Sequence, residues 1–189
     1  MKNTIKARIE QSIEVKEDLH KGQVEHIEKA ARLIISALRS GGKVLLFGNG
    51  GSAADSQHIA AELVGRFKKE RRALPAIALT ANTSTLTALA NDYGYDVVFS
   101  RQIEALAKEG DVVLGFSTSG SSKNMIVALN RARAIGAKTI GLTGAGGGTM
   151  KNFCDCLITV NSKDTARIQE SHIMIGHIIC ELVENELFK

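Results

Sequence analysis

The stretch from Leu45 to His58, LLFGNGGSAADSQH, runs from an apolar segment through a glycine-rich turn directly into a predicted helix. Backbone N–H groups at a glycine turn can approach an anion closely, and the helix N-terminus behind them adds partial positive charge. A second turn, FSTSGSS at residues 116–122, also follows an apolar run and precedes a predicted helix. Two such turns in one small domain predict a phosphorylated ligand held beside polar side chains.

Short apolar runs recur along the chain and alternate with segments long enough to be helices. The runs cover residues 44–47, 76–79, 112–116, 139–142 and 157–160. The helical segments between them begin near Ala53, Ser84, Ser122 and Thr149. This alternation is typical of βαβ units and predicts an α/β fold with a doubly wound parallel sheet. Ligands of such sheets bind beyond the carboxyl ends of the strands, where both turns lie.

Helices are predicted on both sides of this alternating region. Apolar residues recur at helical spacing over residues 5–19 and, on a broader face, over 24–38. The segment 164–187 is predicted to be a long helix that is apolar on more than one face, which implies burial against the sheet and against another subunit. We expect a single domain over residues 1–189, with N-terminal helices at 1–40 and the α/β core at 41–189.

Composition excludes several classes of protein. The chain has 189 residues, 44% of them hydrophobic, with one proline, so it can bury a core and has no long linker. The N-terminus lacks the apolar region of a signal peptide, and no stretch is long enough to span a bilayer, so we expect a cytoplasmic protein without a membrane partner. The three cysteines are predicted to be reduced packing residues, because they suit neither a disulfide framework nor a structural zinc site.

The net charge of +4 suits an anionic ligand, but it does not by itself indicate nucleic-acid binding. One basic cluster follows the first core helix, with positive charges at Arg66, Lys68, Lys69, Arg71 and Arg72. Basic side chains at a helix end complement the helix dipole, and the chain has few aromatic residues for stacking on bases. We therefore predict a solvated helix end and loop here, and no nucleic-acid partner.

His58 and Glu62 are the first candidates for chemistry. They are four residues apart, so on a helix they share a face and can bind one metal ion or transfer protons together. A surface His/Glu pair is the common alternative, but the position of this pair behind a phosphate-type turn favours a functional role. Arg66, one turn further on, is expected to pair with Glu62 and keep it ionised.

The last helix carries three further candidates. His172 is expected to be a satisfied core residue, whereas His177 lies among apolar neighbours where a buried imidazole needs a partner. Eight residues separate Gln169 from His177, which is about 12 Å of helix, so the two can share a metal only if both side chains lean inward or different subunits contribute. We expect a site assembled between chains.

Two other motifs allow more than one interpretation. Asn91 and Asp92 can form a helix C-cap and turn, or their amide and carboxylate groups can recognise sugar hydroxyls. The glycine run at residues 144–148 does not fit a dinucleotide-binding fingerprint. The GNGGSAAD segment does not match a P-loop either, because no lysine and hydroxyl residue close it.

Together these pieces resemble the sugar isomerase (SIS) domain family, and within it the phosphoheptose isomerases. The resemblance is carried by four ordered motifs: GNGGSAADSQHIAAEL at 48–63, ANDYGYDVVFSRQ at 90–102, GFSTSGSSKN at 115–124 and DTARIQESHIMIGH at 164–177. It implies a flavodoxin-like five-stranded parallel sheet and a homotetramer. It also implies the aldose-ketose isomerisation of D-sedoheptulose 7-phosphate to D-glycero-D-manno-heptose 7-phosphate, for bacterial activated-heptose synthesis.

The same resemblance assigns roles to individual residues. It places the phosphate on Ser117, Thr118, Ser119 and Ser122, and the sugar on Asn49, Gly50, Gly51, Asn91 and Asp92. It implies one Zn²⁺ per subunit, bound by His58, Glu62, Gln169 and His177. Glu62 and His177 also form the acid/base pair, and Glu62 and Gln169 contact the substrate. A carboxylate bound tightly to zinc is a poorer base, so the two roles of Glu62 require loose or changing coordination.

A second function stays open at this point. The SIS family includes a non-enzymatic assembly factor that binds the replication initiator DnaA and resembles this chain through much of its length. That relative has not kept the residues that match Glu62 and His177, whereas both are present here, and this favours the enzyme.

Overall fold

A computed structural model describes residues 1–188 of the chain. Its centre is a five-stranded, all-parallel sheet with the strand order β2-β1-β3-β4-β5. The strands are β1 (Val44–Gly48), β2 (Ala76–Ala78), β3 (Val112–Ser117), β4 (Lys138–Thr143) and β5 (Cys156–Thr159). This order is that of the flavodoxin-like doubly wound fold. The predicted fold class and all five predicted strands are confirmed, and no strand end differs from its predicted position by more than one residue.

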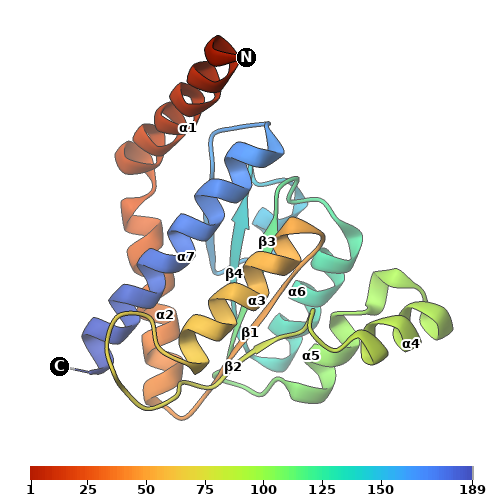
Figure 1. Ribbon diagram of the computed structural model, residues 1–189. Helices are drawn as coiled ribbons and strands as arrows, with labels where there is room; N and C mark the ends of the chain where they lie inside the picture. The colour runs from red at the N-terminus through yellow and green to blue at the C-terminus, as the bar shows by residue number, and fades with distance from the viewer. Residues whose placement is uncertain (189) are drawn as a thin grey trace.

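Helices cover both faces of the sheet (Figure 1). One face is packed by α2 (Val24–Arg39), α3 (Gly51–Val64) and α7 (Thr165–Leu187), and the other by α5 (Ser100–Leu106) and α6 (Lys123–Ile135). α4 (Thr83–Tyr93) has no buried residue and adds partly buried side chains to the edge of this second face. Side chains alternate along each strand, so each face of the sheet has its own hydrophobic core. Leu46 of β1 belongs to the core beside α2, α3 and α7, and Phe47 belongs to the core beside α5 and α6. Both cores are closed by aliphatic side chains on the helices.

One predicted helix is wrong. The segment near Thr149 contains only a short 3₁₀ turn, η2 (Thr149–Asn152), between β4 and β5. Three successive glycines, Gly146 to Gly148, have positive φ angles of 79°, 75° and 52°. Only glycine adopts such angles readily, so the chain turns sharply here and too few residues remain for an α-helix. A second 3₁₀ turn, η1 (Tyr95–Val97), follows α4.

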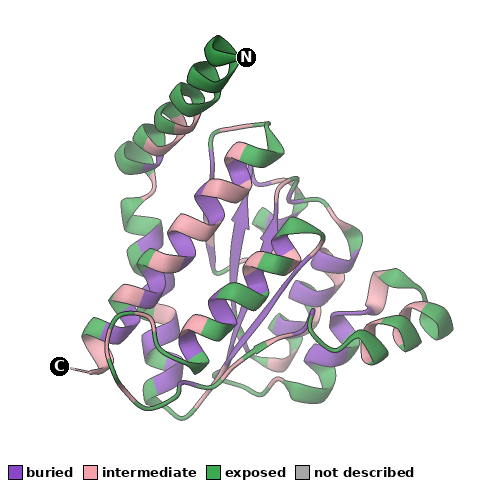
Figure 2. Cartoon of the chain, viewed as in Figure 1, coloured by how far each residue is buried: buried purple, intermediate pink, exposed green. Residues whose placement is uncertain are grey.

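The first helix, α1 (Lys2–Gly22), extends away from the sheet and is mostly exposed (Figures 1 and 2). The predicted apolar stripe is present, but Ile5, Ile9 and Ile13 are 59%, 56% and 51% exposed, and Leu19 is the buried residue of this helix. The N-terminal residues thus form two helices as predicted, although only α2 packs on the sheet. Within residues 1–188, no helix combines the length and the hydropathy needed to cross a membrane.

The fold places α3 and α7 side by side on one face (Figure 1). Their close approach depends on Gly176, where an added Cβ would lie 2.5 Å from the Ile59 side chain. Both helices begin at the carboxyl edge of the sheet and run in the same direction, so Gly51 lies against Gln169 and His58 against His177. Residues at matching positions of the two helices therefore face one another along a shared seam.

Candidate functional site

The two predicted anion-binding turns meet at the carboxyl edge of the sheet. β1 and β3 are neighbours, so the turn after Gly48 and the turn after Ser117 lie side by side at the point where the strand order reverses. Between them is a cavity of about 60 Å³. Its walls come from Asn49, Ser52, Phe116, Ser117, Thr118, Ser122 and Gln169. This volume is large enough for a group of a few atoms, such as a phosphate, but too small for a whole sugar. The sugar of a bound sugar phosphate would therefore extend out of the cavity.

Two glycines shape the first turn. Gly50 has φ +59° and ψ −123°, a conformation that a residue with a side chain rarely adopts. At Gly51, the first residue of α3, an added Cβ would lie 2.5 Å from Gln169 Nε2. These residues bring the first turn of α3 against the amide of Gln169. Gly50, Gly51 and Gln169, which are predicted to contact the substrate, thus lie together at one end of the site.

Asn49 is held by two residues that sequence reasoning did not single out. Its side-chain amide exchanges two hydrogen bonds with Asn124, each of 3.0 Å, and its carbonyl also accepts from the Tyr95 hydroxyl at 3.1 Å. Asn124 lies in the first turn of α6, so this pair ties the two predicted anion-binding turns together. Both residues lie within quoted motifs, but their contact joins separate motifs and has no signature in either one.

The second candidate region lies further along the seam between α3 and α7. His58 Nε2 is 3.1 Å from Glu62 Oε1 and 3.2 Å from His177 Nε2. Ligand atoms from these three residues all lie within 4.8 Å of one another. The predicted common face of His58 and Glu62 is therefore confirmed, and the partner that His177 needs is His58.

The donor set of this cluster suits a metal ion. Ligands bonded to zinc at about 2.0–2.1 Å in a tetrahedron stand about 3.3 Å from one another. The observed separations of 3.1 and 3.2 Å are close to that value. Two imidazoles and a carboxylate are also a common catalytic zinc set, in which the fourth position stays open. Without a metal, the same atoms need shared protons, because two unprotonated nitrogens repel one another.

The expectation of a site assembled between chains is wrong for these three residues. One chain alone brings His58, Glu62 and His177 together. Gln169 lies two helical turns away along α7, at the level of Gly51 and the phosphate-sized cavity. Its side chain contacts that end of the site, and its predicted membership of the metal set stays a prediction.

The predicted pairing of Arg66 with Glu62 is also wrong. Arg66 lies beyond the end of α3 and pairs with Glu70 across 3.6 Å. Arg71 approaches Glu62 instead, but it contacts the main chain: its Nη2 donates to the Glu62 carbonyl oxygen at 2.8 Å. The Glu62 carboxylate is left to interact with His58.

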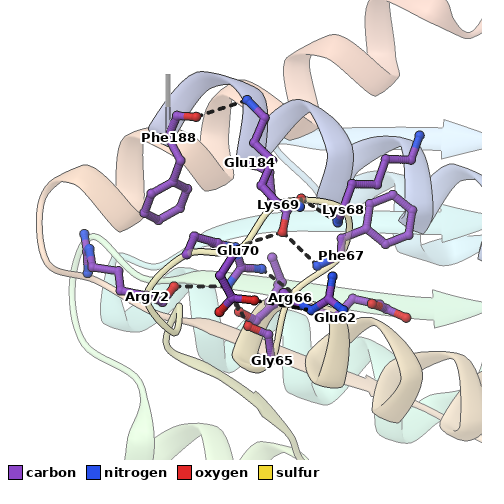
Figure 3. Close-up of polar contacts among 12 residues, drawn as sticks. Glu62, Gly65, Arg66, Phe67, Lys68, Lys69, Glu70, Arg72, Glu184 and Phe188 are labelled. Atoms are coloured by element: carbon purple, nitrogen blue, oxygen red, sulfur yellow. Dashed lines mark hydrogen bonds and ion pairs between the residues drawn. The ribbon is translucent and has the colours of Figure 1, made fainter.

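The basic segment after α3 is not simply solvated. The Arg71 side chain is 1% exposed and forms an ion pair of 2.9 Å with Glu184, whose side chain is equally buried. Figure 3 shows the Glu184 carboxylate enclosed by the loop that follows Gly65. The carboxylate also accepts hydrogen bonds from the backbone N–H groups of Phe67, Lys68 and Lys69. Burial raises the pKa of Glu184, but these four donors outweigh it and hold the pKa below its usual value.

Asp55 is a further site residue that sequence reasoning missed. It lies on the same face of α3 as Gly51 and His58, between the phosphate-sized cavity and the His58 cluster. Its Oδ2 is buried and has no hydrogen-bond partner within the described residues 1–188. Burial raises the pKa of this carboxyl to about 6, and the neighbouring His58 opposes the rise. The spacing of residues 51, 55, 58 and 62, which places them on one face of a helix, is the sequence pattern that could have identified Asp55 as a site residue.

Asn91 and Asp92 lie exposed at the end of α4, outside the residues that line the cavity. The Asn91 amide donates to the Asp92 carboxylate at 2.9 Å, and Gly94 caps the helix with φ +90°. The structure thus gives these residues the geometry of a helix C-cap and turn. Their link to the site is Tyr95, whose hydroxyl bonds Asn49.

His172 is a core residue as predicted, but it is not satisfied. It is fully buried with its ring 6.1 Å from that of Phe116, and neither ring nitrogen makes a hydrogen bond of normal geometry within residues 1–188. Burial lowers the pKa of this imidazole to about 4, opposed by the nearby Thr143 backbone. The histidine therefore stays neutral near pH 7.

The cysteines agree with their prediction as reduced packing residues. Cys154, Cys156 and Cys180 are all free thiols, and the last two are buried. Burial, reinforced by the neighbouring Glu62 and Glu184 carboxylates, raises the pKa of Cys180 to about 12. A thiol with such a pKa is unreactive at neutral pH.

Comparison with known proteins extends this description over the whole chain. The model of the SIS domain family matches residues 9–144. The chain is 57% identical over 190 aligned residues to a phosphoheptose isomerase of Clostridium acetobutylicum, covering 100% of this chain and 97% of that protein. Among solved structures, it is similar to a phosphoheptose isomerase from Francisella tularensis, with a TM-score of 0.94, 38% identity and 97% of each chain covered. It is also similar to the enzyme from Neisseria gonorrhoeae, with a TM-score of 0.93, 43% identity and coverage of 97% and 98%.

Proposed function

The chain belongs to the SIS domain family, and from this premise we propose that it is a phosphoheptose isomerase whose substrate lies along the seam between α3 and α7. The phosphate occupies the cavity lined by Ser117, Thr118 and Ser122, with Ser119 on the same turn as a further donor. The reacting carbons lie at Glu62 and His177. Relatives with the isomerase name match the entire chain, and this favours the enzyme over the DnaA-binding assembly factor.

The observation that carries this proposal is the distance between the two ends of the seam. Seven residues of α3 separate Gly51 at the cavity from His58, which is about 10 Å of helix. In sedoheptulose 7-phosphate, eight bonds separate C1 from phosphorus, and an extended chain of that length also spans about 10 Å. A seven-carbon sugar held by its phosphate therefore reaches the His58, Glu62 and His177 cluster with its C1 end.

The acid/base groups of the cluster suit an enediol mechanism. Glu62 takes a proton from C1 of the ketose while His177 gives a proton to the oxygen on C2, which forms the enediol. Glu62 then returns a proton to C2, and the oxygen on C1 gives its proton to His177, which forms the aldose and restores both groups to their starting states. No atom is gained or lost, so one carboxylate and one imidazole are sufficient.

We include Zn²⁺ in this proposal, with His58, Glu62 and His177 as the residues that would hold it and Gln169 as the predicted fourth ligand. The ion would supply a Lewis acid that polarises the sugar carbonyl. The mutual distances of the three residues support the proposal. His58, which is not needed for the proton transfers, then serves to hold the ion and to orient Glu62.

The proposed function is tested by an assay for conversion of sedoheptulose 7-phosphate, with and without a chelator. We expect conversion by the purified protein, its loss after chelation and its return on addition of zinc. Conversion that is unaffected by complete metal removal would support the isomerase activity and contradict the role of zinc. An absence of conversion in metal-loaded protein would contradict the function itself.

Loss of a hydroxyl from the serine turn is expected to weaken phosphate binding. The Ser119→Ala and Ser122→Ala variants each remove a donor to a charged oxygen, and we expect each to raise KM by roughly 10-fold or more. Inhibition by inorganic phosphate should weaken in parallel. Ser121→Ala is the matched control, because the exposed Ser121 hydroxyl bonds only the Ser119 carbonyl within the described chain. Unchanged phosphate inhibition in both test variants would place the anion elsewhere.

We propose a homotetramer that acts in the cytoplasm and supplies heptose 7-phosphate for activated-heptose synthesis. The assembly is supported by apolar side chains that one chain leaves exposed: Ile5, Ile9 and Ile13 on α1, and Ile178 and Leu182 on α7. Copies of the chain packed on α1 and α7 would cover them and close the outer side of the seam. Light scattering on the purified protein tests the number of subunits.

A further inference from the structure

The loop after α3 places an aromatic ring on the His177 imidazole. The rings of Phe67 and His177 are stacked, with centroids 5.3 Å apart and planes 20° apart. On another side, His58 meets His177 edge-on at 4.9 Å. The imidazole is therefore held between two rings, one from α3 and one from the loop.

The loop itself is fixed by a buried carboxylate. Glu184 accepts from the backbone N–H groups of Phe67 at 2.7 Å, Lys68 at 2.8 Å and Lys69 at 3.0 Å (Figure 3). Glu184 lies two turns beyond His177 on α7, so the helix that carries the imidazole also anchors the ring stacked on it. The position of Phe67 relative to His177 is thus set within a single rigid unit.

Arg71 joins this unit to α3. Its guanidinium pairs with Glu184 and donates to the carbonyl oxygens of Glu62 and Leu63, each at 2.8 Å. These carbonyls belong to the last turn of α3, which carries the Glu62 side chain. The Glu184–Arg71 pair therefore connects the ends of the two helices that present the acid/base groups.

We propose that Phe67 is a positioning residue for His177, and that Glu184 acts through the loop to hold Phe67 in place. This inference rests on the proposed function, because it gives His177 a proton-transfer role. A stacked ring leaves the imidazole free to move within its plane but resists tilting, so the proton stays aimed at the sugar oxygen. Displacement of a reacting group by about 1 Å can cost roughly 100-fold in rate.

The proposal is tested with Phe67→Leu in the metal-loaded enzyme. Leucine fills much of the volume but presents no flat ring, so we expect kcat to fall by roughly 10- to 100-fold, with KM within twofold of wild type. Phe67→Tyr keeps the stacked ring and should retain wild-type kcat. Phe188→Leu is the matched control, because that ring lies over Arg71 and Arg72 on the same loop.

A spectroscopic measurement makes the test independent of turnover. In protein labelled with ¹³C-histidine, the ring current of Phe67 shifts the His177 signals, which are assigned by their loss in His177→Gln. We expect Phe67→Leu to move these signals and to leave those of the distant His20 and His26 unchanged. Glu184→Gln, which weakens the loop anchor without changing its volume, should move the His177 signals in the same direction.

The outcomes separate the two proposals. If wild type does not convert the sugar phosphate, the proposed function fails, while the histidine signals still report whether Phe67 orients His177. If wild type is active and Phe67→Leu keeps its kcat, the positioning role is overturned. It is also overturned if Phe188→Leu loses as much activity as Phe67→Leu, or if Phe67→Tyr fails to retain activity, because the effect would then belong to the packing of the loop.

Discussion

Replacing Glu62 by glutamine is expected to lower kcat for heptose phosphate isomerisation by roughly 10²- to 10⁴-fold, because an amide cannot take the proton from C1. The substitution keeps the size of a side chain that lies only partly buried at the His58 cluster, so the fold should be unaffected. His177→Gln should cause a loss of the same order, since it removes the group proposed to protonate the sugar oxygen. The two changes together should cost little more than either one, because both groups serve the same proton transfers.

The measurement is kcat at saturating sedoheptulose 7-phosphate, with the zinc content of each sample determined in parallel. Zinc content matters because glutamine is also a weaker ligand than glutamate. Glu70→Gln is the matched control: it makes the same chemical change at an exposed carboxylate whose partner is Arg66. Near wild-type turnover in either Glu62→Gln or His177→Gln would defeat the acid/base assignment.

Removal of the Arg71 charge is expected to be the most damaging change to stability. Arg71→Met leaves the Glu184 carboxylate buried at 1% exposure without its ion-pair partner. Breaking a buried pair in this way costs about 3–5 kcal/mol in the free energy of unfolding. The loss should be larger than the ion pair alone suggests, because Arg71 also binds the carbonyl oxygens at the end of α3.

Chemical unfolding at a fixed protein concentration measures this effect, with Arg72→Met as the control at an exposed neighbour. The pH dependence gives an independent check. The folded-state pKa of Glu184 lies below its ordinary value of 4.5, so its contribution is present above that value and is lost as the pH falls. The acid side of the stability profile should therefore flatten in Arg71→Met. A free energy of unfolding within about 1 kcal/mol of wild type would contradict the account.

The sequence predicted those features that depend on local pattern. The five strands follow from short apolar runs, and the shared face of His58 and Glu62 follows from their spacing on a helix. The Thr149 helix was wrong because three glycines with positive φ took up the available residues. Hydrophobic periodicity identifies segments that can be helical, but it does not show how many residues the preceding turn occupies.

The contacts that could not be predicted are long-range. Glu184 and Arg71 are 113 residues apart, and each resembles an ordinary charged residue near a helix end. In the sequence, Phe67 likewise resembles an ordinary loop residue, because its contact with His177 exists only where α7 packs beside α3. The approach of these helices depends on Gly176 and Ile59, which no short window of sequence brings together. Resemblance to a family assigned the acid/base pair, but it left the surrounding anchor unassigned.

The parallel course of α3 and α7 has a consequence for selectivity. In the proposed binding mode, a sugar phosphate is anchored at one end of the seam, so each carbon removed would withdraw C1 from Glu62 by about 1.2 Å. Pentose and hexose phosphates would still satisfy the serine turn and bind, but their reacting carbons would fall short of the carboxylate. Selectivity for heptose phosphates over shorter sugar phosphates then needs no side chain that sterically excludes the smaller molecules. Shorter sugar phosphates would instead occupy the enzyme as competitive inhibitors, bound through the same anchor and left unreacted.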